Sequence, residues 1–163
     1  MGLFSRRSRK NSHSELDKSL IRAFSAVLYF DSTMGGFFKM GGSGDNAKRV
    51  RAALGALAKD IADNGTVSGD ETVGSLTDAK IKALHSAGLL IKDCHVFPVA
   101  CIMWAREDAD KYGSSQSVKQ DLETALGLFL SAAVMFEDAE DIARSAAQNQ
   151  ARYRQFASVM DNA

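Results

Sequence analysis

The chain has 163 residues with an apolar share of 45% and a charged share of 25%, which are the proportions of an ordinary soluble globular domain. No stretch reaches about 18 consecutive uncharged apolar residues, so no transmembrane helix is expected. No apolar run follows the basic N-terminus either, which argues against a secretory signal. The expected location is therefore the cytoplasm or an intracellular assembly, and the chain is not expected to be secreted.

Charge is distributed unevenly, although its formal net value is zero. Residues 99–163 contain ten acidic and six basic residues, whereas residues 1–13 contain bases and no acid. These bases are Arg6, Arg7, Arg9 and Lys10. We expect residues 1–13 to form a flexible basic arm and residues 14–163 to form one helical domain. Such an arm fits the phosphates of nucleic acid or of lipid headgroups. It could equally be a solvated tail, or bind the acidic stretch 137–141 of another copy.

The first helix is predicted from Ser14 to about Phe30–Asp31, because its apolar residues recur at helical spacing. A glycine-rich stretch follows at residues 35–44, and it carries Phe37, Phe38 and Met40 between its glycines. It lacks the Gly-Lys-Ser/Thr ending of a nucleotide-binding loop. These three apolar side chains are candidates for contact with a partner or a membrane interface, or for capping the bundle.

The second helix is predicted to begin at Asp45 and to end in the stretch that follows Ile61. Its apolar stripe includes Val50, Leu54, Leu57 and Ile61. The opposite side is basic, with Lys48, Arg49 and Arg51 in its first half. Together with the arm, these three residues are the candidate contacts for an anionic partner.

The most informative motif is the stretch of residues 60–71, which reads Asp-Ile-Ala-Asp-Asn-Gly-Thr-Val-Ser-Gly-Asp-Glu. Its spacing resembles the calcium-binding loop of the EF-hand family, with Gly65 at the sixth position. Calcium takes six to eight oxygen ligands, and the closing Glu of such a loop supplies two. The resemblance implies a calcium site formed by Asp60, Asn64, Thr66, Ser68 and Glu71.

The third loop position is Ala62, where the family has Asp or Asn. With one ligand fewer, the expected affinity is weak, on the order of 10⁻⁴ M or poorer. A plain helix end followed by a turn at Asn64-Gly65 also explains these residues. Residues 53–68 with Glu71 look similar, in addition, to the helix and acidic turn of the TerB-like helical family.

Three more helices are predicted in the second half of the chain. One begins near Thr77 and should turn Ile81, Leu84, Gly88 and Ile91 inward. Pro98 is expected to kink or break the chain, and the apolar run 96–104 predicts a buried helix that stops at Gly113. The last and longest helix should begin at Ser117 and extend through Met160 with fraying near residues 148–150. Its inward stripe would include Phe136, Ala143 and Ala147. The fold expected is a single-domain all-α bundle of about five helices.

The two cysteines and three histidines do not form a recognisable catalytic or zinc pattern. Cys94 and Cys101 are seven residues apart, about 10 Å along a helix, which is too far for a disulfide bond. We therefore expect buried reduced thiols and no enzymatic activity. The function predicted is that of a structural protein that interacts or assembles with itself or another protein, as in a viral or other large assembly. A calcium-responsive regulator and a module that binds a membrane surface or nucleic acid are the alternatives.

Overall fold

The structure is a computed structural model that describes the backbone of residues 2–35, 45–64 and 73–163, and the side chains of 15–35, 45, 48–63 and 73–163. The described part is all-α, as predicted, but it contains seven α-helices rather than five. They are α1 (Gly2–Thr33), α2 (Asp45–Asn64), α3 (Val73–Ala87), α4 (Val96–Tyr112), α5 (Gln116–Ala133), α6 (Ala139–Gln148) and α7 (Gln150–Asp161). A short 3-10 helix, Ile91–Asp93, precedes α4.

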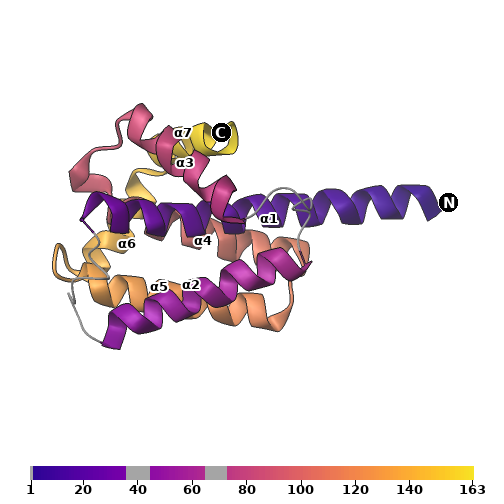
Figure 1. Ribbon diagram of the computed structural model, residues 1–163, viewed down its shortest axis with the longest axis horizontal. Coiled ribbons are helices and arrows are strands. Elements are labelled where there is room, and N and C mark those ends of the chain that lie inside the picture. The colour runs from indigo at the N-terminus through magenta and orange to yellow at the C-terminus, as the bar shows by residue number, and fades with distance from the viewer. Residues whose placement is uncertain (1, 36–44, 65–72) are drawn as a thin grey trace.

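The helices form three layers (Figure 1). Helices α1 and α4 pack against each other in the middle, and α6 lies against α4. The pair α3 and α7 covers one side of this middle layer, and the pair α2 and α5 covers the other. This arrangement surrounds the second half of α1 and the first half of α4, which explains where the core lies.

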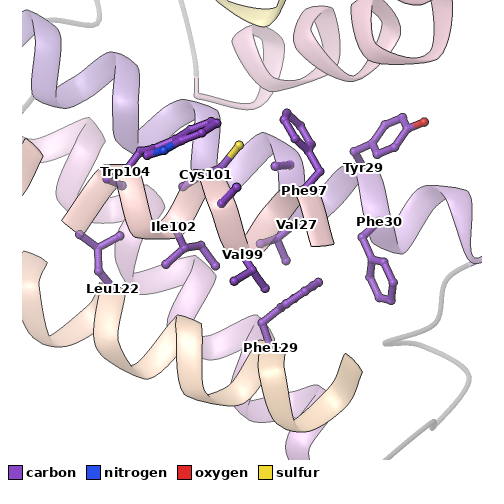
Figure 2. Packing of buried hydrophobic residues seen from close by; sticks show 14 of the residues in the cluster. Val27, Tyr29, Phe30, Phe97, Val99, Cys101, Ile102, Trp104, Leu122 and Phe129 are labelled. Atoms are coloured by element: carbon purple, nitrogen blue, oxygen red, sulfur yellow. The ribbon is translucent and has the colours of Figure 1, made fainter. Parts of the chain in front are cut away.

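Burial along α1 is therefore wider than one stripe. The large residues Leu20, Val27 and Phe30 are buried, and so are the small residues Ala23 and Ala26. Figure 2 shows Val27 beside Val99 and Ile102 of α4, with α5 closing the core from below. The rings of Phe30 and Phe129 meet edge to face at 5.1 Å between centroids. Because α4 is buried from Val96 to Cys101, the prediction of a buried helix there is confirmed.

The prediction of one long C-terminal helix is wrong, because the chain turns twice within it. The first turn ends at Asp138, whose side chain accepts a hydrogen bond of 2.9 Å from the Glu140 backbone N–H and begins α6. The second falls at Asn149, between α6 and α7. Each turn resets the helical phase, so Ile142 and Ala146 are buried instead of Ala143 and Ala147.

Two other predicted helix ends are corrected. Pro98 does not break the chain, because it is the third residue of α4, where its missing N–H would have had no partner within the helix. The N-cap of α5 is Ser115 rather than Ser117. The predicted stop at Gly113 is confirmed: this residue has φ 69° and its N–H donates to the carbonyl of Ala109.

The flexible arm predicted over residues 1–13 is not confirmed. The backbone is helical from Gly2 and continues without a break into the rest of α1. Figure 1 shows these first turns extending beyond the other helices, at the end of the molecule that carries the N-terminus.

Candidate interaction surface

The structure describes only the first part of the predicted calcium loop. Asp60 lies within α2, and Asn64 is the last residue of that helix. Thr66, Ser68 and Glu71 lie outside the described residues. Among the side chains that are described, no group of three or more His, Cys, Asp or Glu residues is placed to hold a metal ion. The calcium site remains a prediction.

Asp60 meets a second carboxyl group across the contact between α2 and α5. The side chains of Asp60 and Asp121 are hydrogen-bonded, and burial together with this contact raises the pKa of Asp121 to about 6. Asp60 also borders a pocket of about 380 Å³ between α1, α2 and the turn that joins α4 to α5. Asp17 and Ser114 border the same pocket. A proton shared between two carboxyl groups explains how they come so close.

The basic residues predicted to meet an anionic partner lie on two elements. Lys48, Arg49 and Arg51 are exposed on the first half of α2, and none of them has an ion pair among the described side chains. Half of the other bases with described side chains form ion pairs; for example, Arg22 pairs with Asp161 at 2.7 Å. Arg6, Arg7, Arg9 and Lys10 occupy the projecting turns of α1, whose side chains are outside the described set. Phe37, Phe38 and Met40 also lie outside it.

Large apolar side chains are exposed on two turns at the other end of the molecule. We call this surface the apolar end, and it is formed by Leu90, Ile91, Val134, Met135 and Phe136. Ile91 is 70% exposed and Met135 is 65% exposed. The first turn joins α3 to α4 and the second joins α5 to α6. The apolar end thus contains five of the six large apolar side chains that are exposed in the described part of the chain.

Consecutive residues near the end of α1 connect the two turns of the apolar end. The Tyr29 hydroxyl donates a 3.4 Å hydrogen bond to the carbonyl of Leu89. The ring of Phe30 meets that of Phe136 edge to face, with 5.8 Å between centroids. Figure 2 shows Tyr29 and Phe30 leaving α1 in different directions, which is why one helix can hold both turns.

His95 fixes the second turn to the start of α4. Its Nε2 lies 3.0 Å from Oε2 of Glu137, and its ring stacks on Phe136 at 5.7 Å. The ring of Phe136 is therefore packed on two sides and still 46% exposed. Its exposure is a consequence of defined contacts rather than of a loosely held side chain.

The first turn is fixed to α7 by a buried polar cluster. Asp93 forms an ion pair of 2.7 Å with Arg152 and accepts a 3.2 Å hydrogen bond from the Tyr153 hydroxyl. Burial, and then the neighbouring Asp93 carboxylate, raise the pKa of Tyr153 above its ordinary value. These contacts hold the 3-10 helix in place, and its first residue, Ile91, remains in solvent.

Cys94 adjoins this cluster and is a buried thiol. It lies in the turn before α4 rather than on one helix face with Cys101, and both are free and buried. Burial raises the pKa of Cys94 to about 11 and raises that of Cys101 as well. A thiol whose pKa is raised by burial holds little thiolate at neutral pH.

The apolar end was missed by sequence reasoning. The helical pattern predicts Gly88, Ile91 and Phe136 on inward stripes, but all three are exposed. The prediction is wrong because α3 ends at Ala87 and α5 at Ala133, so the helical period does not continue to these residues. No local signal distinguishes these residues, because the apolar triplet 134–136 resembles the triplet 128–130 of α5, which packs in or against the core.

Comparison of the chain with protein-family models, with curated proteins and with solved structures finds no match in any of the three. No helix in the described part of the chain is both long enough and apolar enough to cross a bilayer.

Proposed function

We propose that this protein is a non-enzymatic helical assembly protein that associates with further copies of itself through the apolar end. The observation that carries the proposal is the exposure of five large apolar side chains on two turns that are each fixed by specific contacts. Removing these side chains from water stabilises an association by roughly 25 cal/mol for each Å² of apolar surface covered.

A second copy is favoured as the partner by the charges beside the apolar end. Glu137, Asp138, Glu140 and Asp141 directly follow its second turn. The chain itself carries the complementary charge in its basic N-terminal stretch. An apolar centre with a charged rim is the usual composition of a protein–protein interface.

The test is the mass of the purified protein in solution as its concentration rises. Analytical ultracentrifugation of the wild type should show a concentration-dependent increase in mass. Met135→Glu and Ile91→Glu should each lower it, because a carboxylate cannot enter an apolar contact without losing its hydration. Val159→Glu is the matched control, because Val159 is exposed on α7 away from the apolar end. A wild type that stays monomeric at several hundred micromolar would refute the proposal.

An anionic partner is a second candidate, supported by the uncompensated cluster Lys48, Arg49 and Arg51. Its test is the binding of single-stranded DNA and, separately, of vesicles containing anionic lipid. Replacing the three residues with Gln should weaken binding to one of these probes, whereas Lys82→Gln, an exposed base on α3, should not. Binding that falls equally in both variants would show only a general effect of charge.

Calcium regulation through residues 60–71 is also a proposal. Its support is the spacing of the oxygen-bearing residues in the sequence.

A further inference from the structure

We infer that the apolar end binds the N-terminal stretch Leu3–Lys10 of a second copy, so that copies join head to tail. The inference rests on the proposed self-association and specifies its partner segment. Three arguments support it, and they concern the positions, the residue types and the symmetry of two surfaces, the apolar end and the N-terminal stretch.

The two surfaces lie at opposite ends of one helix. Helix α1 has 32 residues and is therefore about 48 Å long. Its C-terminal part contributes Tyr29 and Phe30, which hold the turns of the apolar end. Its N-terminal turns extend past the other helices (Figure 1). A contact between the two surfaces of one copy is excluded by this distance, but a contact between two copies is not.

The two surfaces have complementary residue types in the same order. The N-terminal stretch begins with Leu3 and Phe4, and its four bases follow at residues 6–10. The second turn of the apolar end presents residues 134–136, and four acids follow at 137–141. Aligned in parallel, apolar residues meet apolar residues and bases meet acids.

The acidic side retains charge for such a contact. Glu137 lies against His95, and Asp141 pairs with Arg144 at 2.5 Å. Glu140 is exposed and has no ion pair among the described side chains. The four acids of residues 137–141 thus outnumber the basic groups that contact them. The N-terminal stretch supplies four bases and contains no acid.

Because the two surfaces differ, the contact cannot be shared symmetrically by two copies. Each added copy leaves one free apolar end and one free N-terminal stretch. The assembly therefore grows as an open chain unless it closes into a ring, of which the smallest is a dimer with two reciprocal contacts.

Two full-length variants test this directly. The first replaces Arg6, Arg7, Arg9 and Lys10 with Glu, which should abolish docking by the N-terminal stretch. The second combines Ile91→Glu with Met135→Glu, which should block the apolar end. Each variant alone should sediment as a monomer. The equimolar mixture should form a dimer of twice the monomer mass and grow no further, because each variant keeps one intact surface. Circular dichroism of both variants checks that the fold is retained.

The outcomes separate the two levels of the proposal. If the first variant still self-associates as the wild type does, the N-terminal stretch is not the partner, and head-to-tail joining is refuted while self-association stands. If both variants are monomeric and their mixture is too, head-to-tail joining is also refuted. If the wild type itself remains monomeric, the proposed function fails.

Discussion

At the scale of single residues, the pair Asp60 and Asp121 is the most unusual contact in the bundle. Two carboxyl groups share a hydrogen bond between α2 and α5, and the pKa of Asp121 rises to about 6. The folded state therefore retains a proton that the unfolded state releases at lower pH. The resulting stability is present in acid and is lost as the pH rises through about 6.

We predict that Asp121→Asn stabilises the protein at neutral pH. The amide cannot ionise, so it removes the repulsion that develops above about pH 6. The rise in the thermal unfolding midpoint relative to wild type should be larger at pH 7.5 than at pH 4.5. Asp63→Asn, an exposed position on α2, is the control and should show no such dependence. An equal shift at both pH values would contradict the shared proton.

At the scale of helices, the turns determine where the apolar side chains point. Local pattern was sufficient for α2, whose stripe Val50, Leu54, Leu57 and Ile61 is buried as predicted. It failed for the segment after Ala133, because the turn at residues 134–138 interrupts a sequence that is helix-forming on both sides. The turns also determine what a glycine contributes, because a glycine at a helix end and a glycine within a helix differ in backbone conformation.

We predict opposite effects of alanine at these glycines. Gly55 of α2 and Gly127 of α5 lie within helices, and a Cβ there would meet no atom within 4 Å. Gly55→Ala and Gly127→Ala should each increase the free energy of unfolding by up to about 1 kcal/mol. Gly113→Ala should decrease it by roughly 1–2 kcal/mol, because φ is 69° there. Urea unfolding measures all three, and a loss of stability at Gly55 or Gly127 would show that the helix surface at that position is covered.

At the scale of the whole molecule, the basic N-terminus and the apolar, acidic end are separated by the length of α1. The net charge of zero does not reveal this separation of charge, because it sums the basic N-terminus and the acidic end. Contacts between exposed charges weaken with salt, so ionic strength should shorten the proposed assembly while the apolar contribution persists.

A calcium ion bound at residues 60–71 would stabilise the whole domain by mass action, because it binds the native state. We predict a rise in the thermal unfolding midpoint with millimolar calcium and none with equal magnesium. The variant Glu71→Gln removes the closing carboxylate and should abolish the rise. No shift at several millimolar calcium would reduce the stretch to a turn.

Much of the helical content was readable from local pattern, whereas the candidate surface was not. The periods of α2 and α4 and the stop at Gly113 depend on neighbours within a few residues, so their sequences are sufficient. Burial of Ile91 and Phe136 depends on which helix covers them. Phe129 of α5 lies in the core and Leu126 packs against it, but Phe136 follows the end of α5.

The sequence alone thus determined the all-α class, the positions of the central helices and the uneven distribution of charge, because each of these depends on composition or on short-range periodicity. Only the tertiary structure decided that the turns 88–92 and 134–137 lie at one end of α1 and leave Ile91 and Met135 in solvent. It also brought Asp60 to Asp121, which are far apart in the chain. Exposure and contact between distant residues are set by the packing of helices, and no local pattern contains that information.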